Sequence, residues 1–112
     1  MSLSEIVEGY AVLLSDIANS GEVQCLGLGW DEVYAGNVEF TAKGWRFTLF
    51  NDCDSLDYTD SVTAPDGSQA SFDELFEPLS DPIRLASSKL DRKNLERQLK
   101  LAKSISKSRR VR

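Results

Sequence analysis

The stretch GWRFTLFNDCDSLDY (residues 44–58) contains the densest apolar run and the densest run of aspartates in the chain. In its first half, apolar residues alternate with Arg46 and Thr48, and this period of two predicts a β-strand with one buried face. From Asn51 onward, the Asn and Asp side chains can bond to nearby backbone amides, which favours a turn. The stretch therefore predicts a buried strand that breaks at Asn51 and leads into an acidic turn.

The preceding run, residues 38–42, alternates in the same way and predicts the partner strand of a hairpin. If Lys43 and Gly44 form a two-residue loop, the loop fixes which positions pair. A slip of one residue would bury Glu39 and Arg46, so the apolar pattern and the loop favour the same register. This register places three apolar pairs on one face: Ala42 with Trp45, Phe40 with Phe47, and Val38 with Leu49.

A third antiparallel strand is predicted over residues 56–63. Its apolar face holds Leu56, Tyr58 and Val62, but the alternation also places Asp60 on that face. A carboxylate at such a position predicts a bulge, a strand end or a hydrogen-bonded buried acid. The Pro-Asp-Gly sequence that follows predicts a type I or type II turn.

The N-terminal part predicts one long helix and two short elements. Residues 3–18 repeat apolar side chains at helical spacing, and Ser2 and Glu5 have the spacing of a capping box. Gly21 can take the left-handed conformation just past the helix end. Residues 22–29 predict a short strand or extended segment.

The next segment, residues 30–36, predicts a single helical turn. Trp30, Val33 and Tyr34 would share one face of this turn, and Gly36 would end it.

The C-terminal third predicts a second capping box and a second long helix. Ser71 and Glu74 have the spacing of a cap for a short helix that stops before Pro78. An extended piece over residues 83–86 then precedes a helix that begins at Asp91. The apolar stripe of that helix consists of Leu95, Leu99, Ala102 and Ile105.

Together these elements predict an α+β fold. In it an N-terminal helix packs on a three- or four-stranded antiparallel meander, followed by short helices and a basic C-terminal helix. The chain has 112 residues, which fits one domain. We expect an acidic α+β part over residues 1–86, and a basic helix with a frayed tail over residues 87–112. This second part either belongs to the same domain or serves as a dimerisation arm.

The charge is divided along the chain. Residues 1–82 carry sixteen acidic and two basic residues, a net charge of −14, whereas residues 83–112 carry eleven basic and two acidic residues, a net charge of +9. The basic tail includes Arg92, Lys93, Arg97, Lys100, Lys103, Lys107, Arg109 and Arg110. The favoured interpretation is that the basic helix lies across the acidic body of its own chain or of a twin, as in a homodimer. The alternative is nucleic-acid binding through phosphate contacts, which the acidic body and the lack of aromatic residues in the tail disfavour.

Asp52, Asp54, Asp57 and Asp60 form an acidic cluster for which a calcium site is one hypothesis. The spacing does not fit a standard calcium loop, and a strand over residues 56–60 would point Asp57 away from Asp60. We therefore expect neither a metal nor a cofactor here. Asp52, Asp54 and Asp57 are instead the candidate partner-binding residues on the outside of the turn.

Several function classes are disfavoured by what the chain lacks. The sequence contains no histidine, which excludes catalytic triads and zinc sites that need imidazole. Cys25 and Cys53 lack metal-ligand spacing and predict two free thiols in a reducing cytoplasm. No apolar run is long enough to span a bilayer, and no signal-peptide pattern is present. We expect no catalytic residue and no membrane partner.

The central motifs resemble a small bacterial family of single-domain proteins that has no assigned function. The shared features are a W…Y-x-G element, a Gly-Trp strand, an FNDC-D-x-LDY core and a PDG turn, over about residues 30–76. The matching positions are Trp30, Tyr34, Gly36, Gly44, Trp45, Phe50, Asn51, Asp52, Cys53, Leu56, Asp57, Tyr58, Pro65, Asp66 and Gly67. The resemblance implies no activity, and it does not extend to the basic C-terminal segment.

The function that we expect is a small non-enzymatic module that binds an unidentified protein partner or has a regulatory role. One alternative is an acidic inhibitor that imitates nucleic acid and occupies a basic groove of its target. Another is nucleic-acid binding through the basic helix. Salt dependence and the identity of the captured partner would separate these alternatives.

Overall fold

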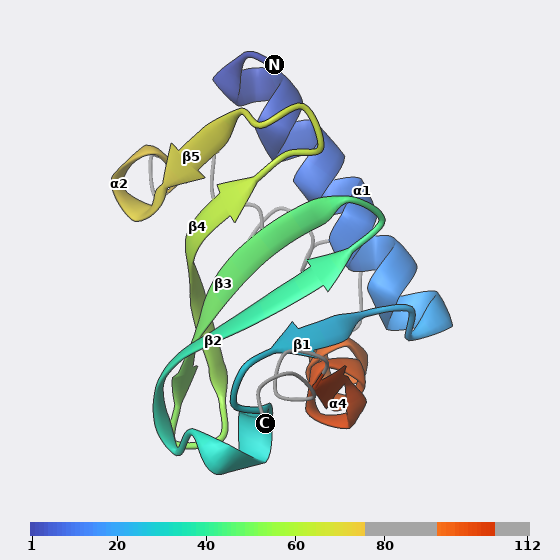
Figure 1. Cartoon of the computed structure of the whole chain (residues 1–112), viewed down its shortest axis with the longest axis vertical. Coiled ribbons are helices and arrows are strands. Elements are labelled where there is room, and N and C mark those ends of the chain that lie inside the picture. Colours follow the sequence, from blue (N-terminus) through green and yellow to red (C-terminus); the bar gives the residue numbers. More distant parts are fainter. Residues whose placement is uncertain (76–91, 105–112) are drawn as a thin grey trace, which may run out of the picture.

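The computed structural model describes residues 1–75 and 92–104 (Figure 1). Five sequence predictions lie wholly or partly outside these residues. They are the helix stop before Pro78, the extended piece over residues 83–86, the helix start at Asp91, the position of Ile105 in the apolar stripe, and the frayed tail.

The first helix, α1 (Leu3–Ser20), has both of its predicted caps. The Ser2 hydroxyl accepts from the amide of Glu5 at 3.2 Å, and the Glu5 carboxylate accepts from the amide of Ser2 at 2.8 Å. Gly21 has a φ of 73° and donates its amide to the carbonyl of Ile17. A left-handed residue at this position satisfies a carbonyl of the last turn, so the helix ends there.

The sheet has six strands in the order β5-β4-β3-β2-β1-β6. The pairings among strands β1 to β5 are all antiparallel. The added strand β6 pairs parallel with β1. The α+β class is therefore confirmed, but the sheet is larger than the predicted three- or four-stranded meander. The strand bounds are β1 (Gln24–Leu26), β2 (Ala35–Ala42), β3 (Trp45–Asp52), β4 (Leu56–Thr63), β5 (Gln69–Ser71) and β6 (Lys103–Ser104).

The β2–β3 hairpin has the predicted register. Ala42 pairs with Trp45, Phe40 with Phe47 and Val38 with Leu49. The two loop residues have positive φ values, 50° at Lys43 and 87° at Gly44. Two left-handed residues are what a type I′ loop requires, and this loop matches the twist of the paired strands.

Strand β4 contains the irregularity that Asp60 predicted. Its pairing with β3 shifts twice, so that Phe47 pairs with Val62 whereas Leu49 pairs with Thr59. Thr59 is 2% exposed, whereas Tyr58 and Asp60 are only half-buried. The bulges thus place a threonine in the core where simple alternation expected Tyr58.

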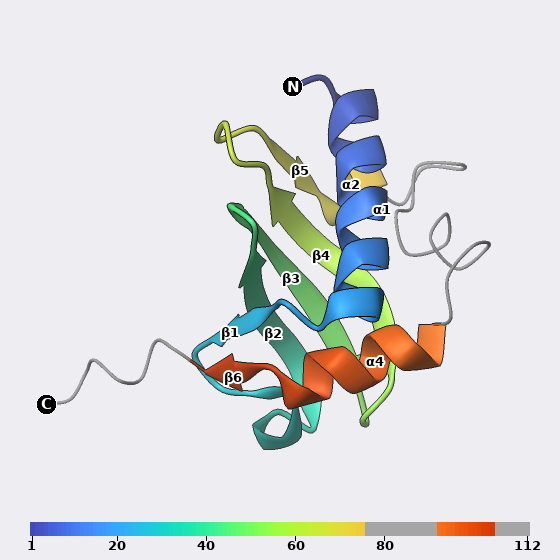
Figure 2. The same ribbon diagram turned by 90° about the vertical axis from the view of Figure 1, so that its right-hand side faces the viewer.

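Helices α1 and α4 (Arg92–Leu101) cover the same face of the sheet (Figure 2). Tyr10 of α1 packs against Trp45 and Phe47 with ring centroids 6.3 and 5.5 Å apart, and Phe47 stacks on Phe40 at 5.7 Å. A Cβ at Gly9 would lie 2.8 Å from the Trp45 ring, so the glycine allows this close approach. These aromatic rings form the centre of the core.

Helix α4 is part of the same core. Leu95 and Leu99 are 1% and 0% exposed, and the side-chain amide of Asn94 donates to the carbonyl of Ala18 at 2.5 Å. The two leucines face their own chain, as the interpretation of an intrachain contact expects. Leu95 and Leu99 belong to the same core cluster as the buried residues of α1 and the sheet.

Two sequence predictions are corrected by the described elements. The 3₁₀ turn η1 (Trp30–Glu32) buries Trp30, but Tyr34 is 72% exposed instead of sharing its face, because the backbone is extended at Val33. Helix α4 ends at Leu101, and the chain then pairs with β1 as strand β6. Ala102, which was predicted to continue the apolar stripe of this helix, therefore lies just beyond its end.

Candidate functional site: the acidic hairpin loop and the cavity beside Trp30

The acidic turn is a tight two-residue loop between β3 and β4. The backbone groups of Asp52 and Ser55 form two hydrogen bonds, at 2.8 and 3.1 Å. Between them, Cys53 and Asp54 both have positive φ values, 52° and 73°. Strand β3 continues through Asp52, so the prediction that it breaks at Asn51 is wrong. The pairing of Asn51 with β2 and β4 holds the strand extended to that point.

The carboxylate of Asp54 joins three elements. One oxygen accepts from the indole Nε1 of Trp30 at 3.1 Å, and the other accepts from the Lys100 ammonium at 3.0 Å. The bond from Lys100 is the main reason that the pKa of Asp54 lies below its ordinary value, with the bond from Trp30 acting in the same direction. The same pair raises the pKa of Lys100. The loop, η1 and α4 therefore meet at this side chain.

Further bonds hold α4 against the start of β4. The guanidinium of Arg92 donates to the carbonyls of Leu56 and Asp57 at 2.7 and 3.2 Å. The amide of Leu56 donates in return to the carboxylate of Glu96 at 2.8 Å. The acidic turn with the start of β4 and the basic helix, which the sequence treated as two separate candidate sites, thus lie side by side.

The carboxylates of Asp52 and Asp57 are exposed and have no hydrogen bond or ion pair within the described part of the chain. The remaining described bases, Lys93, Arg97 and Lys103, are exposed on α4 and β6. Lys107, Arg109 and Arg110 lie outside the described residues.

Asp54 also forms part of the wall of a small cavity of about 240 Å³. It is lined by Trp30, Asp31, Tyr34, Asn51 and Asp54. The pKa of Tyr34 is raised, first by a hydrogen bond with the Cys53 side chain and then by the nearby Asp54 and Asp52 charges. The cavity therefore combines two aromatic rings with two carboxylates, and Asp52 lies close enough to act on Tyr34.

Asn51 provides the buried polar group of this cavity. Asn51 is 1% exposed. Its Nδ2 donates to the carbonyls of Trp30 at 3.1 Å and Val33 at 2.6 Å. Both donors are thus used, which fixes the orientation of the amide. The Oδ1 atom is buried and accepts no hydrogen bond from the described residues.

Sequence reasoning missed three residues of this cavity for identifiable reasons. Asn51 continues the inward-facing positions of Phe47 and Leu49, so a polar residue at a core position was the available signal. Tyr34 was expected to share one face of a helical turn with Trp30 and Val33. Asp31 was not considered beside the hairpin loop, because nothing in the local sequence indicates that η1 and the loop meet.

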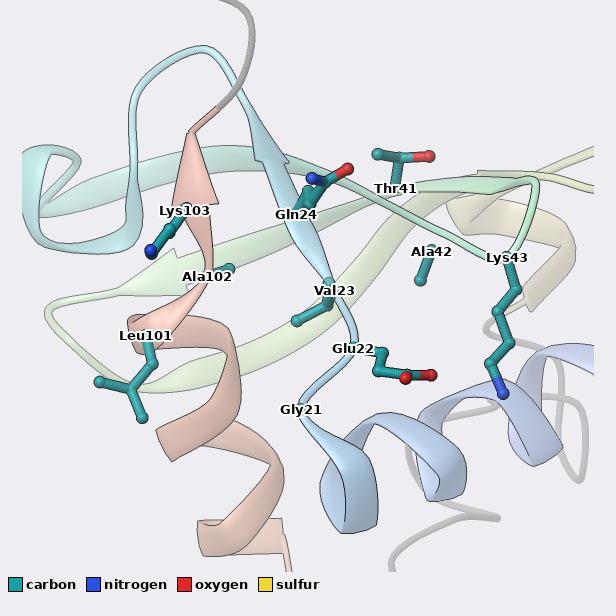
Figure 3. Close-up of a pocket in the computed structure, with 10 residues that line it drawn as sticks. All are labelled: Gly21, Glu22, Val23, Gln24, Thr41, Ala42, Lys43, Leu101, Ala102 and Lys103. Atoms are coloured by element: carbon teal, nitrogen blue, oxygen red, sulfur yellow. The ribbon is translucent and has the colours of Figure 1, made fainter.

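A larger cavity, of about 550 Å³, lies beside the C-terminal end of α4 (Figure 3). It is bordered by the end of α1, the β2–β3 loop and the junction of α4 with β6. Its charged side chains are Glu22, Lys43 and Lys103, and the Lys43 ammonium lies 3.4 Å from the Asp16 carboxylate. Side chains of both charge signs line it. None of its lining residues has a buried side-chain polar atom that lacks a hydrogen-bond partner.

Two further observations limit the chemistry of the described residues. They contain no group of three or more His, Cys, Asp or Glu side chains that could hold a metal ion. Their helices include none that is long and apolar enough to cross a membrane. Cys25 is buried and Cys53 is exposed, and neither forms a disulfide within the described residues.

Comparison with known proteins gives one match. The model of the family described as "Domain of unknown function (DUF7693)" matches residues 8–101. The matched range contains α1 from residue 8 onward and all of α4, as well as the central motifs, so it extends further on both sides than the resemblance seen in the sequence. Searches of curated proteins and of solved structures returned no match.

Proposed function

Since the chain belongs to the DUF7693 family, whose function is not assigned, we propose a role from its geometry. The protein is a non-enzymatic protein-binding module, and its binding surface is the end formed by η1 and the β3–β4 loop. The observation that carries this proposal is the exposed ring of Tyr34 beside an acidic cavity. We call this surface, consisting of Asp31, Tyr34, Asp52 and Asp54, the acidic end.

The exposure of Tyr34 supports a protein partner. Its side chain is 72% exposed, the largest value among the exposed large hydrophobic residues of the described chain. Tyrosine is enriched at protein interfaces because its ring buries a large apolar area at little entropic cost while its hydroxyl retains a hydrogen bond. A ring that contributes nothing to the core is available for such a contact.

The charge of the acidic end indicates the kind of partner. Lys100 neutralises one of the three carboxylates, and Asp31 and Asp52 have no ion pair within the described residues. A net negative surface attracts and orients a basic one, and it disfavours acidic competitors. The expected partner therefore presents a basic segment.

The two alternatives receive less support from the contacts. Nucleic-acid binding through α4 would use its cations, but Arg92 and Lys100 are engaged with β4 and the hairpin loop. Imitation of nucleic acid would use the acidic turn, but Lys100 neutralises Asp54 there. Both alternatives stay predictions, as do a regulatory role, a homodimer, a cytoplasmic location, a bacterial origin and the FNDC core as a family signature.

Site-specific photo-crosslinking tests the proposal. A variant with Tyr34→p-benzoylphenylalanine is irradiated in native lysate, beside a control variant with Val12→p-benzoylphenylalanine on α1. Val12 is 62% exposed, so the two probes are similarly accessible but lie on different surfaces. We expect a discrete protein adduct from position 34 that is absent from position 12 and that weakens as salt is raised. Identical adducts from both positions, or an adduct with nucleic acid, would refute the proposal.

A further inference from the structure

We propose that the cavity of the acidic end binds the guanidinium group of an arginine side chain from the partner protein. This inference rests on the proposed protein-binding function and names the group that the surface recognises. It is carried by three features of the cavity: an unpartnered buried acceptor, an excess of negative charge, and aromatic walls.

The unpartnered acceptor is the Oδ1 atom of Asn51. A buried carbonyl oxygen without a hydrogen-bond donor costs free energy, and such groups are uncommon in native proteins. Rotating the amide by half a turn does not resolve this, because the oxygen would then face the carbonyls of Trp30 and Val33. Asn51 lines the cavity, so a donor to this atom would enter from there, and because the atom is itself buried, the side chains around it must shift to admit that donor.

The charge around this acceptor selects a cation. Asp31 and Asp54 line the cavity, and the charge of Asp52, which follows Asn51 in the chain, acts on Tyr34, another lining residue. Against these three carboxylates stands one base, Lys100, which binds Asp54 from outside the set of cavity-lining residues. A neutral donor would satisfy Asn51 only, whereas a cation also compensates the remaining carboxylates.

The shape of the group follows from the walls. Tyr34 presents an exposed ring, whereas Trp30 lines the cavity but is only 2% exposed, and a planar guanidinium is the cation that most often stacks on aromatic faces. A guanidinium also carries five N–H donors in a fixed fork, so it can donate to an amide oxygen and to a carboxylate at once. A lysine ammonium is more strongly hydrated and concentrates its donors on one atom.

The cavity fits a side chain of a protein better than a free metabolite. Its volume of about 240 Å³ is smaller than that of pockets that bury small-molecule ligands, which span roughly 300–1,000 Å³. Beside it, the exposed Tyr34 and the exposed carboxylate of Asp52 extend the recognition surface outside the cavity. These groups can contact residues that flank an arginine in a polypeptide.

The direct test is an NMR titration that monitors the indole N–H resonances of the two tryptophans in the full chain. Trp30 lines the cavity, whereas Trp45 packs on α1 and serves as the internal control. The probe is N-acetyl-arginine amide, with N-acetyl-citrulline amide as its uncharged analogue. We expect a saturable shift at Trp30 only, with a Kd on the order of 1 mM for a single side chain. Citrulline amide should bind at least tenfold more weakly.

Variants connect this shift to the named side chains. Asp31→Asn removes a charge from an exposed residue and should weaken binding of the arginine amide about three- to tenfold. Asp73→Asn makes the same charge change on the short helix α2 (Phe72–Leu75), outside the cavity, and should leave Kd unchanged. Asn51→Leu should abolish the Trp30 shift. Because Asn51→Leu also loses two hydrogen bonds to the backbone, its folding is verified first. If Asn51→Leu does not fold, the comparison of Asp31→Asn with Asp73→Asn tests the proposed site.

Three results would overturn the inference: an absent Trp30 shift, equal binding of citrulline amide, or free L-arginine bound tenfold more tightly than the blocked amide. The last result would indicate a free metabolite as the ligand. The two proposals fail separately. A partner that crosslinks to position 34 without any arginine-dependent shift at Trp30 refutes the guanidinium site alone. Arginine binding without a position-specific crosslink refutes the protein-binding function.

Discussion

The indole N–H of Trp30 donates to the carboxylate of Asp54 across 3.1 Å, and this bond ties the 3₁₀ turn η1 to the β3–β4 loop. Lys100 binds the second carboxylate oxygen from α4. One exposed aspartate thus connects three segments that are far apart in sequence. The same bond positions Trp30 as a wall of the cavity and leaves its indole as a direct reporter of that site.

Removal of Lys100 should strengthen the binding of a cation in the cavity. The Lys100→Met variant retains most of the apolar stem and deletes the charge, so Asp54 no longer has a competing partner and its pKa rises toward the ordinary value. The Kd for N-acetyl-arginine amide should fall about two- to fivefold at low salt. Lys103→Met makes the same charge change on β6 and should have no effect. A weaker affinity in Lys100→Met would contradict this role.

Helix α4 should be an integral part of the fold. Leu99 is fully buried, and Leu99→Ala should lower the free energy of unfolding by about 2–5 kcal/mol, through lost apolar burial and a residual cavity. Leu101 is 67% exposed on the same helix, and Leu101→Ala should change stability by no more than about 0.5 kcal/mol. Urea unfolding of both variants measures the difference. Equal and small effects would show that α4 is a detachable arm.

A buried hydrogen bond links α1 to the bulged strand β4. The Tyr10 and Thr59 hydroxyl oxygens lie 3.0 Å apart in the core. Thr59→Val preserves the shape of the side chain and removes this bond, so it should cost about 1 kcal/mol of stability. In a double-mutant cycle, Tyr10→Phe should add less in the Thr59→Val background than in the wild type. Strict additivity would indicate that the two hydroxyls do not interact.

The loop between β4 and β5 should make stability depend on pH in the acidic range. The amide of Ser68 and the N-terminal ammonium both donate to Asp66, and they lower its pKa from 3.8 to about 2. Because the folded state favours the ionised carboxylate, its contribution is complete above pH 4 and is lost as the pH falls to about 2. Asp66→Asn should therefore flatten the pH dependence of the unfolding free energy between pH 4 and pH 2. An equal slope in the variant and the wild type would contradict this assignment.

The parts of the fold that the sequence predicted are those controlled by local pattern. The β2–β3 register followed from a period of two and a two-residue loop, since a slip of one residue would have buried Glu39 and Arg46. Helix α1 followed from its apolar stripe, its capping box and Gly21. In both cases several local signals agree, so tertiary contacts had no conflicting preference to override.

The parts that were not predicted depend on contacts between distant segments. The bulges in β4 place Thr59 in the core. The alternation of apolar and polar residues alone does not indicate where the register shifts. Strand β6 forms because Lys103 and Ser104 reach β1, which lies about eighty residues earlier. The cavity required η1 and the hairpin loop to meet, and only Asn51, at an inward-facing position of β3, signalled it in the sequence.

The most direct test of the central claim is a competition that joins the two proposed contacts. The partner is crosslinked to position 34 in the presence of increasing N-acetyl-arginine amide, with N-acetyl-citrulline amide in a parallel series. We predict that the arginine amide reduces the yield of the adduct in step with its occupancy of the cavity, and that the citrulline amide does not. A yield that stays constant at saturating arginine amide would contradict the claim that the acidic end binds its partner through an arginine.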